Sequence, residues 1–163
     1  MLPNFKIKSH FFSAFRELFV HHHGSLEFRA KIFALVISAN DEIKAENYDI
    51  VKKIGIEIYK NDEDRANLLM LSTKELVKKI KENNEFTIDT LIASIQKELR
   101  MVPRYAKKIE VEPLRELIYL SHDNDTISYQ ANILEFLKAI KEETLHEKKS
   151  QIAKDEEKIE SKY

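Results

Sequence analysis

The stretch AKIFALVISA, residues 30–39, contains only two polar residues, Lys31 and Ser38. A helix that is apolar on nearly every side is typical of a buried, central position. The segments on either side carry apolar residues three and four positions apart, which is the helical period and not the alternating period of strands. The sequence therefore predicts an all-α, single-domain bundle of about seven helices, with the helix over 25–40 at its centre.

Composition supports this fold class and excludes several others. The 163 residues include two glycines, three prolines and no cysteine. Strand-rich folds need turn residues at short intervals, so a sandwich, a barrel or an α/β nucleotide-binding fold is disfavoured. The lack of cysteine excludes disulfides, thiolate metal sites and cysteine nucleophiles.

Charge and hydropathy say little about partners. The net charge of −1 gives no general attraction to nucleic acid, so no nucleic-acid partner is expected. No apolar run reaches the length of a membrane span, and the N-terminus does not read as an export signal. The expected location is the cytoplasm.

Capping and breaking residues divide the chain into further helices. The expected caps and breaks are Ser25, Asn61 or Asp62, Thr87, Pro103, Pro113 and Ser128. Gly55 lies inside the predicted helix over 44–59, where glycine costs about 1 kcal/mol of helix propensity. We therefore expect another helix to approach closely at Gly55. The helices over 25–40 and 113–122 are expected to be the most buried.

The composition changes near residue 140. Beyond it the only large aliphatic residues are Leu145, Ile152 and Ile159, spaced by seven in a highly charged background. One apolar position per heptad does not make the usual two-position seam of a coiled coil. We expect a helical domain over residues 1–140 and a charged, solvated helical extension or linker over 141–163.

The N-terminal segment is unusually aromatic, since five of the nine phenylalanines lie in residues 5–19. A helix there would place the candidate interaction residues on one stripe: Phe11, Phe12, Phe15 and Phe19. Such a stripe must be buried, either on the body of the chain or in a partner. We expect it to pack on the body, which makes the protein a monomer; self-association through the stripe is the alternative.

Two helix junctions share the pattern Asn-Asp-x-Ile. The first is residues 40–43 and the second is residues 124–127, so the two copies are 84 positions apart. Each follows an apolar helix and precedes an amphipathic one, which predicts a diverged duplication of one helix–loop–helix unit. Because neither junction contains a glycine, we expect asparagine or aspartate to take the positive-φ position that ends the first helix of each unit.

At these junctions the chain resembles the TerB-like family, which includes tellurite-resistance TerB and the N-terminal domain of DjlA-type, DnaJ-like co-chaperones. That family has junctions of the form alanine–aspartate–glycine–x–hydrophobic, followed shortly by a glutamate. Glu46 is near the glutamate position in the first copy, whereas Gln130 and Ala131 stand there in the second. The aspartate–glycine core has become asparagine–aspartate in both copies.

The resemblance covers about residues 11–140. The other segments that look like the co-chaperone version are Phe11-Phe12, Arg65-Ala66 and residues 133–137. It implies a non-enzymatic protein-interaction domain that serves a chaperone or stress-response system. The His-Pro-Asp signature of a J-domain is absent from these 163 residues.

The resemblance also implies metal binding at the acidic junctions. Hard cations such as Ca²⁺ and Mg²⁺ take several oxygen ligands. The candidate ligands are Asp41, Glu42 and Glu46 at the first junction and Asp123 and Asp125 at the second. The alternative is that these residues cap helix ends and face water.

Three other features could carry chemistry, and each has a simpler interpretation. The histidines at 21–23 could bind a transition metal, but they suit a surface helix end. His122 precedes Asp123, yet no nucleophile or oxyanion feature accompanies the pair. The basic, aromatic stretch over 100–108 suits a solvated loop. No phosphate-binding, zinc-protease or serine-hydrolase motif is present, so we expect no catalytic residues and no enzyme.

Overall fold

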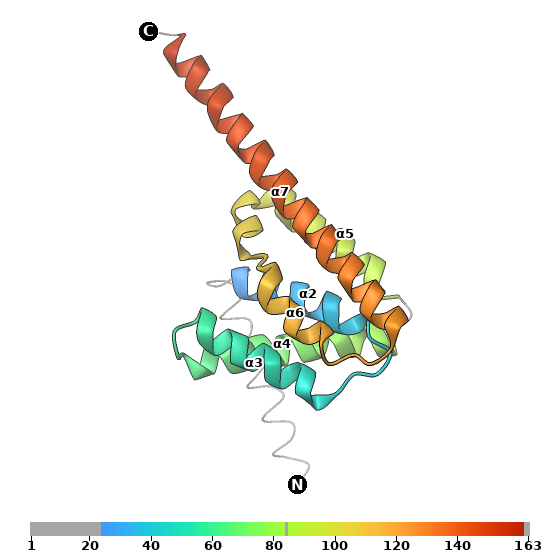
Figure 1. Cartoon of the computed structure of the whole chain (residues 1–163). Helices are drawn as coiled ribbons and strands as arrows, with labels where there is room; N and C mark the ends of the chain where they lie inside the picture. The colour runs from blue at the N-terminus through green and yellow to red at the C-terminus, as the bar shows by residue number, and fades with distance from the viewer. Residues whose placement is uncertain (1–23, 84, 162–163) are drawn as a thin grey trace.

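The computed structural model describes residues 24–83 and 85–161, and every regular element in these ranges is a helix. The elements are α2 (Gly24–Ser38), α3 (Ala45–Ile58), α4 (Glu63–Glu82), α5 (Ile88–Met101), the 3₁₀ helix η1 (Pro103–Lys108), α6 (Val111–Ile118) and α7 (Asn124–Glu160) (Figure 1). The described residues therefore confirm the predicted all-α bundle. The candidate contact residues Phe11, Phe12, Phe15 and Phe19 lie outside the described residues, so their role stays a prediction.

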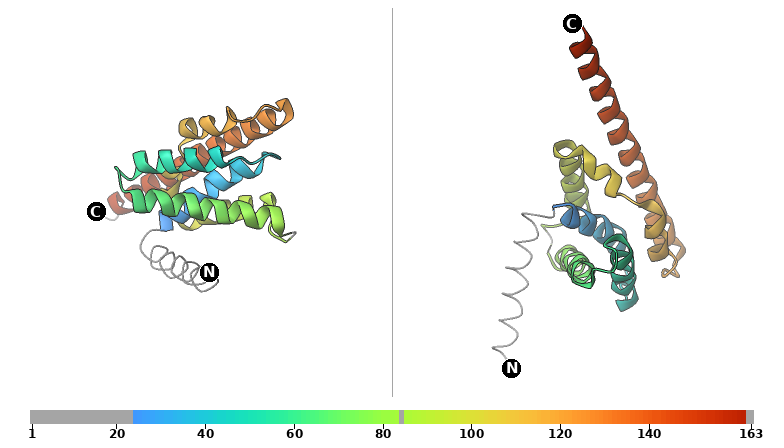
Figure 2. Two further views of the ribbon diagram at one scale, coloured as in Figure 1. Left: turned by 90° about the horizontal axis from the view of Figure 1, so that it is seen from below. Right: turned by 90° about the vertical axis from the view of Figure 1, so that its left-hand side faces the viewer.

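Helix α2 is the centre of the bundle, as the sequence predicted. Eleven of its 15 residues are buried, among them Phe28, Leu35 and Ile37. The helix contacts α4, α5, η1, α6 and α7, and Figure 2 shows other helices on several sides of it. The expected cap at Ser25 is wrong, because α2 already includes Gly24 and Ser25 lies inside the helix.

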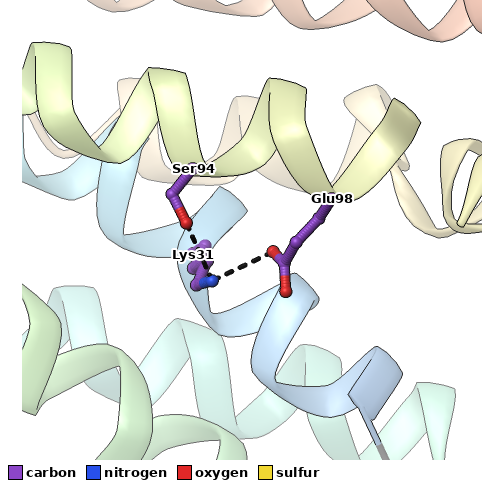
Figure 3. A network of polar contacts seen from close by, with 3 residues as sticks. All are labelled: Lys31, Ser94 and Glu98. Atoms are coloured by element: carbon purple, nitrogen blue, oxygen red, sulfur yellow. Dashed lines mark hydrogen bonds and ion pairs between the residues drawn. The ribbon is translucent and has the colours of Figure 1, made fainter. Parts of the chain in front are cut away.

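A lysine in this central helix is accommodated by partners on α5. Lys31 Nζ donates to Ser94 Oγ at 3.0 Å and forms an ion pair with Glu98 Oε2 at 3.0 Å (Figure 3). A partly buried charge is stable only when it is paired and hydrogen-bonded. This contact joins α2 to α5.

Helices α3 and α4 form an antiparallel pair that is closest at Gly55. A Cβ atom built on Gly55 would lie 3.1 Å from Ala66 Cα and 3.3 Å from Leu69 Cδ2. The predicted close approach of another helix is confirmed. The turn between the two helices places Lys60 and Asn61 at positive φ, 52° and 68°.

Of the other predicted caps, two are confirmed, and the one at Ser128 is wrong. Asp62 Oδ1 accepts from Arg65 N at 3.1 Å, and Thr87 Oγ1 accepts from Thr90 N at 3.2 Å. Helix α7 does not begin at Ser128, because Asp123 already caps it and the helix starts at Asn124. A cap accepts hydrogen bonds from the backbone N–H groups of the first helical turn. Asp123 precedes Ser128 in the chain and already does this, so it determines where α7 begins.

The helix expected over 113–122 is α6, which begins earlier and ends at Ile118. Leu114, Leu117 and Ile118 are buried, and Glu112 is its one exposed residue. Among the described α-helices only α2 has a larger share of buried residues, so the expected burial of this helix is confirmed.

Helix α7 has 37 residues and leaves the bundle partway along its length (Figure 1). At 1.5 Å per residue it is about 55 Å long. Ile133, Leu134 and Leu137 are buried in the core, and Leu145 is the last partly buried apolar residue that packs against it. All residues from 151 to 161 are exposed. The helix continues without a break past the domain boundary expected at residue 140. Among the described helices, none has the length and apolar character needed to cross a bilayer.

Candidate functional site

The structure brings the two helix junctions together around one open hollow of about 460 Å³. The loop between α2 and α3 forms one wall, and the connection between α6 and α7 forms the other. The lining residues are Asn40, Asp41, Glu42, Lys44, Leu120, Ser121, His122, Asp123 and Thr126. Three of the five predicted acidic residues therefore share this space, whereas Glu46 and Asp125 do not line it.

A buried chain of hydrogen bonds holds the two junctions in place beneath the hollow. Asn40 Nδ2 donates to Ser121 Oγ at 3.1 Å, and Ser121 Oγ donates to Gln130 Oε1 at 2.9 Å. Gln130 Nε2 donates in turn to the carbonyl oxygen of Val36 at 2.9 Å. All three polar side chains belong to buried residues. Buried polar groups that satisfy one another fix a single arrangement, so the walls of the hollow are rigidly placed.

The first junction is tied down from a second side. Lys81 Nζ, on α4, donates to the carbonyl oxygens of Ser38 and Asn40, both at 3.2 Å. The backbone N–H of Glu42 donates to Asn40 Oδ1 at 3.0 Å. The two bonds from Lys81 satisfy backbone carbonyl groups at the end of α2 that have no helical partners.

The two Asn-Asp pairs do not occupy equivalent positions, so the predicted register of the duplication is wrong. Asn40 and Asp41 lie in the loop after α2, whereas Asn124 and Asp125 form the first turn of α7. The positions that match are Asn40 and Ser121. Their backbone N–H groups donate to the carbonyl oxygens three residues earlier, each at 3.0 Å.

The expected positive φ at the junctions is wrong for the same reason. Among the described residues other than glycine, positive φ occurs only at Lys60 and Asn61. After each of α2 and α6, a backbone N–H donates to the carbonyl oxygen three residues earlier, and extended residues follow. Neither feature requires the left-handed conformation.

The acidic residues at the junctions serve as caps or face water. Asp123 Oδ2 accepts from Thr126 Oγ1 at 3.0 Å and from Thr126 N at 3.2 Å. These two hydrogen bonds lower the pKa of Asp123 below its ordinary value because they stabilise the carboxylate form. Glu46 and Asp125 lie in the first turns of α3 and α7, where negative charge is favourable. Asp41 and Glu42 are exposed.

The junction residues do not form a compact ligand set. Within residues 24–83 and 85–161, no group of three histidine, aspartate or glutamate side chains is arranged to hold a metal ion. The hypothesis of a Ca²⁺ or Mg²⁺ site at Asp41, Glu42, Glu46, Asp123 and Asp125 stays a prediction.

Calcium titration tests that hypothesis directly. We expect millimolar CaCl₂ to leave the melting temperature unchanged, because a ligand stabilises a fold only when it binds the folded state. Differential scanning calorimetry with and without CaCl₂ measures this. A rise in melting temperature that is abolished by Asp41→Ala with Asp125→Ala would instead establish the metal site.

The basic, aromatic stretch after α5 has a structural role. It forms η1, in which Ala106 is buried and the Tyr105 ring packs 5.2 Å from the Phe28 ring, centroid to centroid. Arg104 lies over the same tyrosine ring at 5.4 Å. These contacts join η1 to the central helix.

The second candidate surface is the distal half of α7, residues 146–160, which we call the distal arm. Ile152 and Ile159 on this arm are 49% and 61% exposed. Seven residues apart, they continue the line of Leu145 along one side of the helix. The sequence showed this spacing, but the position at which α7 leaves the bundle could not be read from it.

Comparisons of the chain with models of protein families, with curated proteins and with solved structures found no match. The resemblance to the TerB-like family therefore rests on the junction motifs and stays a hypothesis.

Proposed function

We propose that this chain is a non-enzymatic protein-interaction domain that contacts its partner through the distal arm. The observation that carries the proposal is the exposure of Ile152 and Ile159 on a helix that has left the bundle. An isolated helix of this length is marginal in water, because most helix stability in proteins comes from packing. A second helix on the exposed side would supply that packing and bury both isoleucines.

The junction hollow supports a structural role for the polar residues beneath it. The Ser121 hydroxyl donates to Gln130 and accepts from Asn40, so its hydrogen-bonding capacity is used inside the network. A serine nucleophile needs a general base as the acceptor of its proton. The neighbouring His122 is an exposed residue at the rim of the hollow. This arrangement favours a binding domain over a hydrolase.

The identity of the partner follows from the family resemblance. If the chain is TerB-like, the partner is a component of a chaperone or stress-response system, and both act in the cytoplasm. The second candidate function is Ca²⁺ or Mg²⁺ binding, which is favoured by the shared lining of the hollow by Asp41, Glu42 and Asp123. The calorimetric experiment above separates the two.

A capture experiment with a matched variant tests the proposal. The full chain is immobilised and exposed to a lysate of the source cells, in parallel with Ile152→Asp/Ile159→Asp and with the control Lys154→Asp on the opposite side of the arm. We expect at least one protein to be retained by the wild type and by the control, and to be reduced at least tenfold with the double variant. Mass spectrometry identifies the retained protein.

The double variant is expected to fold normally, because both isoleucines are exposed and contribute little to the core. Circular dichroism and the melting temperature check this point. Equal retention of every captured protein by the wild type and a folded double variant would contradict the proposed function.

A further inference from the structure

We propose that the distal arm pairs with the distal arm of a second copy of this chain, antiparallel and centred on Ile152. The inference rests on the proposed function, since it takes the arm as the contact surface and specifies its partner. Three observations carry it: the continuity of one face of α7, the place where the bundle ends, and the charges beside the exposed isoleucines.

The exposed isoleucines continue the face by which α7 packs on the bundle. Along this face Gln130 and Leu137 are buried, and Lys141 Nζ donates to the carbonyl oxygen of Ile109 at 2.6 Å. Further positions at the helical spacing of three to four residues lead through Leu145 to Ile152 and Ile159. The bundle covers this face only in part at Leu145, which is half-buried, and leaves it uncovered beyond.

The position of the bundle determines the orientation of a partner helix. A parallel partner on the uncovered face would run back along α7 into the space that the bundle already fills. An antiparallel partner centred on Ile152 places Ile159 beside Leu145 of the second copy. Each helix then ends near Glu160, where the other bundle begins. The two arms overlap over about 22 Å at 1.5 Å per residue.

The charges beside the isoleucines are complementary only in the antiparallel arrangement. Centred on Ile152, the pairing places Lys148 opposite Asp155 and Lys149 opposite Glu156, because the members of each pair lie on the same flank of Ile152 and antiparallel helices keep each flank on one side. Each pair occurs twice. A parallel pairing in register would instead place Lys148 beside Lys149 of the other copy and Asp155 beside Glu156. Like charges brought face to face disfavour such a complex.

Three of these charges have no oppositely charged neighbour along their own helix. The positions three and four residues from Lys148 and Lys149 hold no carboxylate, and those around Glu156 hold no cation. Stabilising ion pairs within a helix form at these spacings. The charges therefore do not support the isolated arm, and an opposing arm gives them partners.

The interface is small, with three apolar layers flanked by four ion pairs. Interfaces below the standard size are typical of weak, reversible complexes. We expect a dimer with Kd on the order of 100 µM, so the measurements need concentrated protein. The sequence-based expectation of a monomer concerned the aromatic segment at the N-terminus, and the extension over 141–163 was expected to stay solvated because it has one apolar position per heptad. In the proposed pair, ion pairs stand beside each isoleucine where a coiled coil would have its second apolar position.

Disulfide trapping tests the register, because the chain contains no cysteine of its own. Lys149→Cys and Glu156→Cys are made as separate single variants and oxidised mildly, alone and as a mixture, at several hundred micromolar. We expect a disulfide-linked dimer from the mixture at a yield at least fivefold above either variant alone. Cross-linking of each variant with itself, or no cross-linking in any sample, would overturn the proposal.

Sedimentation equilibrium tests the charges. Wild type is expected to shift from monomer towards dimer as its concentration rises, and Lys148→Glu/Lys149→Glu to remain monomeric. Adding Asp155→Lys/Glu156→Lys to that variant exchanges the charges and should restore the dimer, whereas the outward control Lys154→Glu should behave as wild type. A wild type that remains monomeric at every concentration, or a charge exchange that does not restore association, overturns the proposal. The capture experiment can still identify a different protein on the arm, so the two failures are distinguishable.

Discussion

Replacing Gln130 with alanine is expected to lower the free energy of unfolding by about 3 kcal/mol. The Gln130 side chain is fully buried, accepts from Ser121 Oγ and donates to the carbonyl oxygen of Val36. Alanine would remove the acceptor of the Ser121 hydroxyl proton and the donor to the Val36 carbonyl oxygen, and it would open a cavity between α2 and α7. For a chain of this length the loss corresponds to a fall in melting temperature of roughly 6–12 °C.

Two further variants separate the causes. Asn132→Ala changes an exposed residue on the same helix and should alter stability by no more than about 0.5 kcal/mol. Gln130→Leu fills most of the volume but supplies no hydrogen bonds, so it should still cost about 1–3 kcal/mol. Chemical denaturation measures all three. A leucine variant as stable as wild type would show that the buried network does not hold the junctions together.

Gly55→Val is expected to destabilise the protein by about 3 kcal/mol. The first atom of any side chain at this position would meet the backbone of α4, 3.1 Å from Ala66 Cα, and backbone atoms cannot move aside as a flexible side chain can. Valine adds two methyl groups in the same narrow space. Helices α3 and α4 would have to separate, which disturbs the packing of α4 against α2 and of α3 against α6.

The comparison with alanine makes this prediction specific. Gly55→Ala gains about 1 kcal/mol of helix propensity, which the crowding at Ala66 offsets, so its stability should stay near that of wild type. Glu57→Val introduces the same β-branched side chain at an exposed position of α3 and serves as the control. If Gly55→Val were no less stable than Glu57→Val in urea denaturation, the close helix approach would not be a constraint.

Features that depend on local chemistry could be predicted from the sequence. The central position of α2 follows from its apolar run, and the caps at Asp62 and Thr87 follow from residues that satisfy helix N–H groups. The cap expected at Ser128 failed because two suitable residues compete, and Asp123 comes first along the chain. Local patterns identify candidates for a helix start without ranking them.

Features that depend on contacts between distant segments could not be predicted. Asn40 and Ser121 are 81 positions apart, and their hydrogen bond exists because two connections pack side by side. The repeated Asn-Asp-x-Ile motif indicated that the junctions were related, but it placed the matching positions in the wrong register. The sequence shows that the apolar residues on the uncovered face of α7 are spaced by seven. It does not show that burial of this face ends near Leu145, because that depends on where the bundle stops.

In the proposed pair a second distal arm covers the uncovered face of the first, and amide hydrogen exchange measures this coverage most directly. Exchange of the full chain is followed at about 1 µM and at several hundred micromolar protein, below and above the expected Kd. We predict that amides over 148–160 exchange rapidly in the dilute sample and at least threefold more slowly in the concentrated one. Amides over 126–140 should be protected equally in both. Exchange of the arm at the same rate at both concentrations would contradict the account.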